Sequence, residues 1–306
     1  MVDKVETIWM DGELVDWDKA QVHVLTHSLH YGLGAFEGIR AYQRADGATT
    51  IFRLHDHIDR LLASCKLCMI RPRFGRDELV KACVDLLREN HMQEAYIRPI
   101  VFLGDGAMGV YAPSNPVRTV VVAWAWGAYL GNEALTRGIR AHISSWARHH
   151  ISVSLAKAKI MGQYTNSIMA KAEAKVAGYD EAILLDTQGY VSEGSGENVF
   201  VVRKGKLVTP PLSCSILEGI TRDTVLALAR EESIPVAEER LTRDELYLAD
   251  EAFFTGTAAE ITPIREVDAR PIGDGKVGPI TQRLQSRYFD VVKGADARHG
   301  EWLTRV

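Results

Sequence analysis

The chain has 306 residues, of which 46% are hydrophobic and 25% are charged, which is the composition of an ordinary soluble globular protein with two domains or one large one. Its formal net charge of −4 excludes the basic footprint expected of a protein that binds nucleic acid or an anionic membrane. The start MVDKVETIWMDGELVDWDKA is too charged for a signal peptide, no apolar run reaches membrane-spanning length, and only four cysteines are present. We therefore expect a cytoplasmic protein.

The N-terminal half predicts strands and two amphipathic helices. A β-meander is expected over 6–24, with the stretches TIWMDG, ELVDW and QVHVLTH as its strands, and the Gly- and aromatic-rich HYGLGAFEGIRAY follows at 30–42. The next expected elements are a strand at 49–52, helices at 54–69 and 76–90, and strands at 95–103 and 118–126. Because these elements lack regular βαβ spacing, they indicate an α+β domain.

The C-terminal half predicts several hairpins. We expect a small α+β domain over 1–126, an interdomain linker at 127–137 and a large domain over 138–306. The expected strands lie at 139–145, 182–185, 190–192, from 199 onward, near 236 and at 252–255, and the expected helices at 166–177, 221–232, 243–247 and 280–293. A loop is expected after the strand at 252–255. The hairpins favour antiparallel pairing over a doubly wound parallel sheet.

Several short motifs do not predict the sites that they resemble. GDGAMG (104–109) matches GxGxxG, but the prolines in the following VYAPSNP prevent the helix that a dinucleotide site needs. GDGKVG (273–278) has too little chain after it to complete such a unit. The CxxC of Cys65 and Cys68 has no second ligand pair nearby and lies in a helical pattern, so buried thiols are expected and no metal.

Two loops are suited to an anion. In LEGITRD, Gly219-Ile220-Thr221 opens an expected helix, whose free backbone N–H groups and Thr hydroxyl can hold a phosphate. In FFTGTAAE, Gly256-Thr257 ends an expected strand and can do the same. Arg60 lies off the apolar stripe of its helix and can add a permanent positive charge. Simple N-capping by the threonines and an ordinary surface arginine are the alternatives.

A phosphate site without a nucleotide motif favours pyridoxal 5′-phosphate. This cofactor needs a lysine for a Schiff base, a carboxylate at the pyridine nitrogen and a phosphate cup. Glu193 lies on the bend SEGSGEN, where two glycines allow a close backbone approach, and can be that carboxylate. SLAKAKIMGQY offers both Lys157 and Lys159, and their spacing does not choose between them.

Seven ordered blocks resemble those of the branched-chain amino acid aminotransferases, which are class IV (fold type IV) pyridoxal-phosphate enzymes. The blocks are HYGLGAFEGIRAY, LHDHIDRL, AYIRP, KIMGQYTNS, GYVSEGSGENVF, EGITRD and LADEAFFTGTAAEITPI, and the resemblance runs from about Trp9 to Tyr288. It implies the family's two-domain α+β fold with largely antiparallel sheets or a barrel. It also assigns Lys159 as the catalytic Schiff-base lysine.

The resemblance also implies the remaining site residues. The cofactor-binding set is Arg60, Lys159, Tyr164, Glu193, Ile220, Thr221 and Thr257. The substrate-binding set is Tyr31, Phe36, Gly38, Arg40, Tyr96, Arg98, Met108, Trp126, Tyr129 and Ala258. Arg98 corresponds to the arginine associated with the distal carboxylate of glutamate. Many members have Asn where this chain has Gln163, so the detail of that turn departs from the family.

The activity implied is transfer of the amino group of L-leucine, L-isoleucine or L-valine to 2-oxoglutarate in a ping-pong reaction. The loop 107–110 resembles one that is reached from the neighbouring subunit, so at least a homodimer, with a hexamer as an option, is expected. Within the same fold, a D-amino acid or (R)-amine transaminase is the alternative. A non-catalytic ligand-binding protein is a more distant one.

Overall fold

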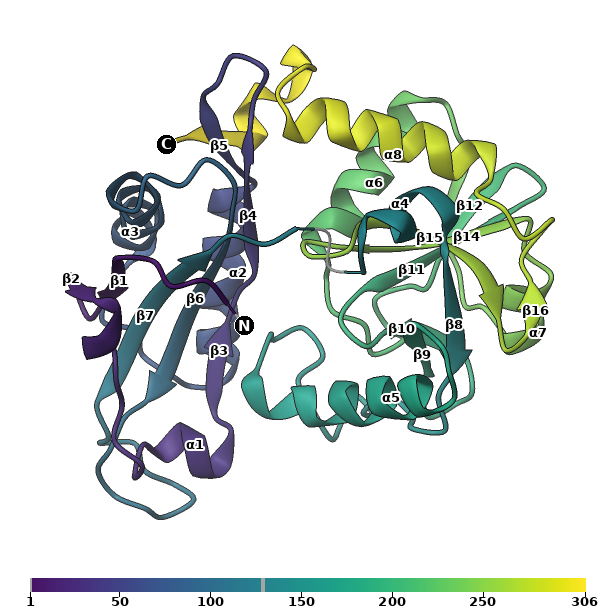
Figure 1. Ribbon diagram of the computed structural model, residues 1–306. Helices are drawn as coiled ribbons and strands as arrows, with labels where there is room; N and C mark the ends of the chain where they lie inside the picture. The colour runs from purple at the N-terminus through teal and green to yellow at the C-terminus, as the bar shows by residue number, and fades with distance from the viewer. Residues whose placement is uncertain (1, 128–129) are drawn as a thin grey trace. The chain divides into compact units, whose positions relative to one another are not determined.

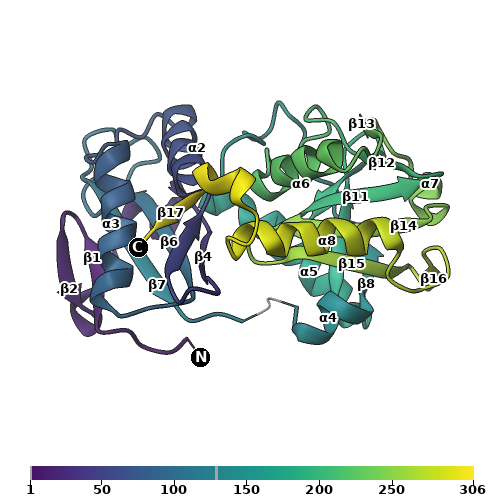
Figure 2. The same cartoon turned by 90° about the horizontal axis from the view of Figure 1, so that it is seen from above.

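The computed structural model describes residues 2–127 and 130–306, which form two compact units (Figures 1 and 2). The first unit contains residues 2–126, 158–163 and 291–306, and the second contains the described residues of 127–157 together with 164–290. The segments 158–163 and 291–306 join the first unit because Ile160 bridges to Ala35 and the C-terminal strand pairs with Thr50–Phe52. The division into domains at 126 and 138 stays a prediction.

The first unit is built on an eight-stranded sheet of order β17-β5-β4-β6-β7-β1-β2, with β3 paired to β6, and its paired strands are antiparallel. Its strands are β1 (Thr7–Met10), β2 (Glu13–Asp16), β3 (Gly34–Phe36), β4 (Ile39–Gln43), β5 (Thr49–Phe52), β6 (Ala95–Leu103), β7 (Val117–Trp124) and β17 (Leu303–Arg305). Its helices are η1 (Trp17–Lys19), α1 (His27–Tyr31), α2 (Leu54–Leu67), α3 (Arg76–Glu89), η2 (Met161–Gln163) and η3 (Ala297–Trp302).

The apolar stripes of α2 and α3 and residues of this sheet share one core. Leu54, Ile58 and Leu61 of α2 are fully buried, as are Leu79 and Leu86 of α3. Each such side chain contributes roughly 1.5–3 kcal/mol when it leaves water. This packing fixes the rotation of α2, and with it the direction of the polar side chains that lie beside the stripe.

The second unit has a nine-stranded mixed sheet of order β10-β9-β8-β15-β14-β11-β12-β13, with β16 paired to β15. Its strands are β8 (Ile139–Ile143), β9 (Glu181–Leu185), β10 (Val191–Gly194), β11 (Asn198–Arg203), β12 (Lys206–Thr209), β13 (Val236–Glu238), β14 (Glu251–Gly256), β15 (Glu260–Val267) and β16 (Arg270–Pro271). Its helices are α4 (Asn132–Arg137), α5 (Tyr164–Val176), α6 (Ile220–Glu231), α7 (Arg243–Tyr247) and α8 (Pro279–Val292). A backbone hydrogen bond of 2.6 Å from Gly194 N to Glu197 O joins β10 to the start of β11, so the sheet curls back on itself.

The α+β class with two sheets is confirmed, and most expected elements lie within two residues of their observed bounds. Two expectations were wrong. QVHVLTH is not the third strand of a meander, because its apolar residues Val22 and Val24 are exposed and η1 interrupts the chain after β2. The loop expected after 255 is largely β15, a mostly buried strand. Its proline, Pro263, and its charged residues are not typical of a buried strand, so the sequence pattern did not indicate one.

In the part of the chain that the structure describes, no helix combines the length and the apolar character needed to cross a membrane.

Candidate functional site

Lys159 lies in the first unit, on the short segment that pairs with β3. Its backbone carbonyl accepts a hydrogen bond of 3.1 Å from Phe36 N, and its own N–H donates to Ser64 Oγ at 3.0 Å. The Lys159 Nζ atom lies 5.2 Å from the centre of the Phe36 ring, within the range of a cation–π contact. The backbone on both sides of the lysine is therefore fixed by β3 and α2, while its amine extends over an aromatic ring.

Lys157, the other lysine of this segment, belongs to the second unit and has a different environment. Its Nζ atom donates to the carbonyl oxygens of Leu212 at 2.6 Å and Ile216 at 3.1 Å. Burial lowers the pKa of this lysine. Since its ammonium is bound to two main-chain carbonyls, Lys157 has the contacts of a structural residue, which supports the assignment of Lys159.

Arg60 projects from α2 toward a buried carboxylate that the sequence reasoning did not single out. Arg60 Nε donates to Glu37 Oε1 at 2.6 Å, and Arg60 Nη2 donates to Glu37 Oε2 at 2.9 Å. Glu37 also receives a hydrogen bond from Gly38 N at 3.2 Å and lies 2.8 Å from His57 Nδ1. The two-pronged ion pair holds the guanidinium in one orientation.

This cluster keeps its charge although it is buried. Burial of Glu37 acts to raise the pKa of its carboxyl, but the charge of Arg60 and the hydrogen bond of His57 outweigh it, so the pKa lies well below the usual range. Burial lowers the pKa of His57. The carboxylate is therefore ionised and paired with Arg60, and the imidazole is neutral at pH 7.

Arg98 and Tyr96 lie on the same face of β6, because alternate residues of a strand point the same way. The Arg98 guanidinium carbon lies 4.8 Å from the centre of the Phe36 ring, 5.3 Å from that of Tyr96 and 5.6 Å from that of Trp124. Its Nη2 donates to Tyr96 Oη at 3.3 Å, whereas its buried Nε has no acceptor among the described residues. An arginine held among aromatic rings with an unused donor is suited to a carboxylate.

Glycine is required at position 38 of this face. A Cβ atom there would lie 1.8 Å from Tyr96 Oη, a separation that real Cβ atoms do not reach. Gly38 therefore allows the Tyr96 ring to lie against the backbone between β3 and β4. Trp126 packs edge-on to Tyr96, with ring centres 4.6 Å apart, and its carbonyl accepts a hydrogen bond of 3.3 Å from Arg40 Nη2.

The loop that contains Met108 is held by α1. Tyr31 Oη donates to the Met108 carbonyl at 2.6 Å, and His27 Nε2 lies 2.9 Å from the Gly109 carbonyl. Within the loop, Asn115 Oδ1 accepts from Ala107 N at 2.8 Å. The structure thus brings Tyr31 and Met108 together. Tyr129, the remaining aromatic residue predicted for the pocket, lies outside the described residues.

Glu193 is buried on β10 of the second unit, where several groups of that unit bind its carboxylate. Arg148 Nη2 lies 2.8 Å from Oε1, and Oε2 accepts hydrogen bonds from Leu217 N at 3.0 Å and Asn198 Nδ2 at 3.2 Å. Both ends of the carboxylate are therefore oriented by side chains and backbone from other parts of the unit. An arginine contact of this kind favours the ionised form.

The N-terminus of α6 lies next to this carboxylate. Ile220 and Thr221 are the first two residues of the helix and are both buried. A Cβ atom at the N-cap Gly219 would lie 1.9 Å from Asn198 Oδ1, so glycine allows the helix to begin directly against Asn198. Asn198 thereby connects Glu193 to a helix end whose free N–H groups and partial positive charge favour an anion.

The Thr257 turn lies beside the same bend. Thr257 and Ala258 lie between β14 and β15, where Gly256 pairs with Glu260. Asn198 pairs with Thr255 across β11 and β14, which brings the Glu193 bend next to this turn. Tyr164 is the first residue of α5. Within the second unit, the structure therefore groups Glu193, Ile220, Thr221 and the Thr257 turn.

Sequence reasoning missed the residues that orient the predicted ones. Glu37, Ser64, Arg148 and Asn198 are all in this class. One signal was present for Glu37, because a charged residue between Phe36 and Gly38 interrupts an apolar, aromatic run. No comparable signal marks Arg148, whose basic neighbourhood resembles a solvated segment.

Comparison with known proteins matches residues 34–267 to the family model described as amino-transferase class IV. A branched-chain-amino-acid aminotransferase of Pseudomonas aeruginosa is 52% identical over 100% of this chain and 99% of its own length. The crystal structure of the Escherichia coli branched-chain amino acid aminotransferase superposes with a TM-score of 0.96 at 46% identity, covering 98% of this chain and 99% of that one.

The T.th. branched-chain amino acid aminotransferase is similar as well. Its structure with pyridoxamine 5′-phosphate gives a TM-score of 0.95 at 47% identity and covers 98% of both chains. Its complex with N-(5′-phosphopyridoxyl)-L-glutamate gives a TM-score of 0.94 at 46% identity. Its complex with 4-methylvaleric acid gives a TM-score of 0.93 at 45% identity, and each match covers 98% of both chains.

Proposed function

We infer the function from one premise: this chain belongs to the class IV aminotransferase family and, within it, to the branched-chain amino acid aminotransferases. It is a pyridoxal-phosphate-dependent transaminase that transfers the amino group of L-leucine, L-isoleucine or L-valine to 2-oxoglutarate. The observation that carries this conclusion is the 52% identity over the full length of a branched-chain enzyme.

The residues of both units fit pyridoxal 5′-phosphate by the chemistry of their donor groups. Lys159 offers an amine next to an aromatic ring, and Glu193 offers a buried carboxylate with an arginine behind it. The first turn of α6 with Thr221 and the Thr257 turn offer N–H and hydroxyl donors for a phosphate, to which we add Arg60. We propose Tyr164 as the hydrogen-bond partner of the cofactor's phenolate oxygen.

When bound, the cofactor would supply an electron sink for the substrate's α-carbon and a carrier for the amino group between the two half-reactions. Lys159 Nζ takes the proton from that α-carbon and returns it as the general acid. Glu193, oriented by Arg148 and Asn198, keeps a proton on the pyridine nitrogen. Arg60 binds phosphate oxygens, and its pair with Glu37 sets the direction of its remaining donors.

One pocket has to accept an aliphatic side chain in one half-reaction and a carboxylate in the other. Phe36 and Trp126 offer apolar surface, where each buried methylene contributes about 0.8 kcal/mol. Arg98 offers its buried Nε to the distal carboxylate of glutamate. Tyr31, Gly38, Arg40, Tyr96, Met108, Tyr129 and Ala258 complete the proposed substrate set.

We propose that the protein acts as a homodimer at least. An exposed apolar surface covers α1, the residues before it and the loop held by Tyr31, and includes Val24, Leu29, Val110 and Tyr111. Monomeric proteins rarely expose apolar surface of this kind without a partner. Leu29→Asp should shift the protein to a smaller species in sedimentation velocity, whereas a wild-type monomer would contradict the proposal.

The cysteines are consistent with the proposed cytoplasmic location. Cys65, Cys68, Cys83 and Cys214 are free thiols. Burial raises the pKa of Cys65 and of Cys83 to about 12, so both remain protonated and unreactive. Buried free thiols are typical of proteins from a reducing compartment.

An absorbance spectrum of the purified enzyme tests the function. L-Leucine should remove the band of the bound cofactor and 2-oxoglutarate should restore it, while D-alanine in a parallel cuvette leaves it unchanged. A response to D-alanine alone would keep the fold and the Lys159 chemistry but identify a D-amino acid transaminase. A protein that acquires no such band after addition of pyridoxal phosphate would contradict the cofactor assignment.

A further inference from the structure

Three carboxylates are buried together around the bend between β10 and β11. Glu181 on β9, Glu193 on β10 and Glu197 on the bend expose 0%, 4% and 6% of their surface. Each charge costs several kcal/mol to remove from water unless it is paired. The charged partners of the three side chains therefore decide how many of them are ionised.

Glu181 has a full set of partners for an ionised carboxylate. The Lys171 ammonium of α5 forms an ion pair with Oε2. Oε1 accepts hydrogen bonds from Ser195 Oγ at 2.7 Å and from Ala182 N at 2.8 Å. Glu193 is equally well supplied, by Arg148 and the donors described above.

Glu197 differs from both, because among the described residues it has no ion pair. Its Oε2 accepts one hydrogen bond of 3.0 Å, from Gly196 N. The side chain packs against the backbone on two sides: a Cβ atom at Gly194 would lie 2.8 Å from Oε2, and one at Gly256 would lie 3.5 Å from Cγ. Glu197 is therefore enclosed between the strand of Glu193 and the Thr257 turn.

Glu181 is paired with Lys171 and Glu193 with Arg148, whereas Glu197 has no ion pair among the described residues. We propose that the three share one proton, that the proton resides on Glu197, and that Glu197 is in this way a positioning residue which leaves Glu193 ionised. Glu197 is then a neutral acid beside two carboxylates that each have a cationic partner.

The electrostatics of the bend agree with this distribution. Burial raises the pKa of Glu197 to about 8, and the neighbouring charges of Glu181 and Glu193 act in the same direction, whereas Lys171 and the Gly196 N–H oppose it. On β14, the uncharged Gly256 lies next to the side chain. Glu260, which pairs with Gly256 from β15, is a further buried carboxylate on this side of the sheet.

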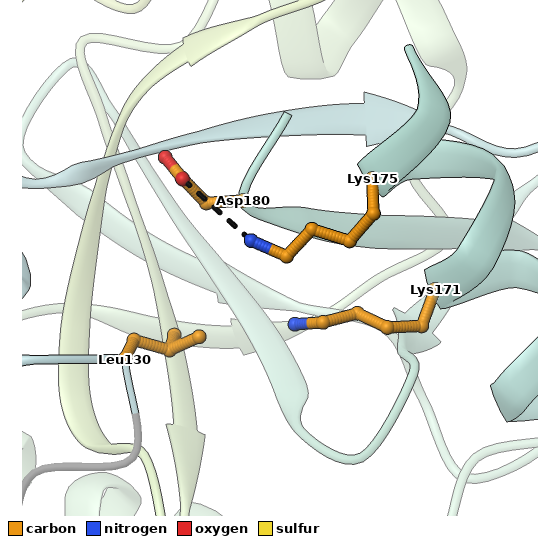
Figure 3. Close-up of a pocket in the computed structure, with 4 residues that line it drawn as sticks. All are labelled: Leu130, Lys171, Lys175 and Asp180. Carbon is orange, nitrogen blue, oxygen red and sulfur yellow. Dashed lines mark ion pairs between the residues drawn. The ribbon is translucent and has the colours of Figure 1, made fainter. Parts of the chain in front are cut away.

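A cavity is lined by Lys171, the ion-pair partner of Glu181. Its volume is about 230 Å³, and its lining includes Leu130, Lys171, Lys175 and Asp180. Figure 3 shows both lysines extending from α5 to this cavity, with Lys175 paired to Asp180 at 3.9 Å. Lys171 therefore belongs both to the cavity lining and to the ion pair with Glu181.

The consequence for the reaction rests on the proposed function. An ionised Glu193 is the form that holds a proton on the pyridine nitrogen. If the shared proton resided on Glu193, this interaction would be lost. The location of the proton is nevertheless a property of the chain itself and can be measured independently of catalysis.

Infrared spectroscopy of the holoenzyme near pH 7 tests the location directly, because a protonated carboxylic acid has its own carbonyl band. We expect the band in the wild type and its loss in Glu197→Gln. It should also disappear in Glu181→Gln, because the negative charge that raises the pKa of Glu197 is removed while Lys171, which lowers it, remains. A wild type without the band, or a band that persists in either variant, would overturn the proposal.

The pH dependence of unfolding gives a second readout. Between its usual value of 4.5 and about 8, the Glu197 carboxyl keeps its proton in the folded state and releases it on unfolding. Stability of the wild type is thus lost as pH rises, and its unfolding constant should increase relative to Glu197→Gln by up to tenfold per pH unit. Glu239→Gln, an exposed carboxylate paired with Lys206, is the control and should show no such increase. Parallel profiles of the wild type and Glu197→Gln would refute the shared proton.

The double variant Glu181→Gln/Glu197→Gln separates charge matching from packing. Each single variant leaves one carboxylate for Lys171, whereas the double variant leaves neither. Its unfolding constant should therefore exceed the product of the two single effects by at least tenfold. Independent effects would contradict the proposal. Spectral titration with L-leucine tests the proposed function separately, because the band of the bound cofactor depends on Lys159. A failed proton assignment with a normal titration would therefore leave the proposed function intact.

Discussion

Glu37 in the first unit and Glu197 in the second are both buried glutamates next to glycine, yet their surroundings drive their protonation in opposite directions. Arg60 and His57 surround Glu37, and the pKa of that carboxyl lies well below the usual range. Glu181 and Glu193 neighbour Glu197, whose pKa rises to about 8. Burial penalises the charge at both positions, so the sign of the neighbouring charges decides the outcome.

The two units differ in the same way in what they offer a ligand. The first unit presents cations, namely Lys159 and Arg98 over aromatic rings and Arg60 beside Glu37. The second presents the Glu193 carboxylate and the backbone donors of a helix end. A cofactor with a phosphate, a basic ring nitrogen and a carbonyl needs both kinds of partner.

The largest expected effect tests which unit supplies the amine. Lys159→Ala should lower kcat by at least about 100- to 10,000-fold, because the general base is lost. Lys157→Ala should keep turnover within tenfold and instead lose about 1.5–3 kcal/mol of unfolding free energy, since two hydrogen bonds from a charged group disappear. Steady-state kinetics and urea denaturation measure both. An active Lys159→Ala with an inactive Lys157→Ala would reverse the assignment.

Glu37→Gln tests Glu37, the ionised one of the two buried glutamates compared above. Breaking its buried ion pair with Arg60 should cost about 3 kcal/mol of stability and weaken pyridoxal phosphate binding, measured by urea denaturation and equilibrium dialysis. Because its folded pKa is depressed, the stability that Glu37 adds is present above pH 4.5 and is lost as pH falls. The gap between the wild type and the variant should therefore close in acid.

A control for Glu37→Gln lies on the same helix as Arg60. Asp59→Asn breaks the exposed pair of Asp59 with Arg76 and should change stability by less than about 1 kcal/mol, with cofactor affinity unchanged. If the two variants behaved alike, the orienting role of Glu37 would be rejected.

Arg98→Ala tests whether this arginine of the first unit binds the distal carboxylate of glutamate. We expect kcat/KM for glutamate to fall by roughly 10- to 150-fold, the value of a charge-assisted hydrogen bond, and that for leucine by less than tenfold. Kinetics of the two half-reactions measure the loss of kcat/KM for each substrate. Equal losses for the two substrates would show that Arg98 supports the pocket without selecting a carboxylate.

Glu197→Gln should change stability less than Glu37→Gln does, and with the opposite sign. Replacing a protonated acid by its neutral isostere should raise the unfolding free energy at pH 7 by about 1–3 kcal/mol. Thermal and urea unfolding of the two glutamine variants, run side by side, make the comparison. Destabilisation by both would mean that the two carboxylates are equivalent and that Glu197 is ionised.

Local sequence signals determined much of the fold. The spacing of Leu54, Ile58 and Leu61 was sufficient to predict α2, because an amphipathic helix needs only one apolar stripe. β5 and β6 were predicted at their observed bounds from β-branched and aromatic residues. β15 was missed because Pro263 is unusual in a strand, and only its neighbours β14 and β8 explain why it is tolerated.

The sequence by itself therefore determined the family, the helices and strands with strong periodicity, and the candidate lysine, carboxylate and phosphate loops. Only the tertiary structure decided which groups orient them. Glu37 meets Arg60 from 23 residues away, and Arg148 meets Glu193 from 45 residues away. Charge pairing of this kind depends on distance in space and on burial, and no periodicity along the chain encodes either. For the same reason, the difference between Glu37 and Glu197 emerges only after folding.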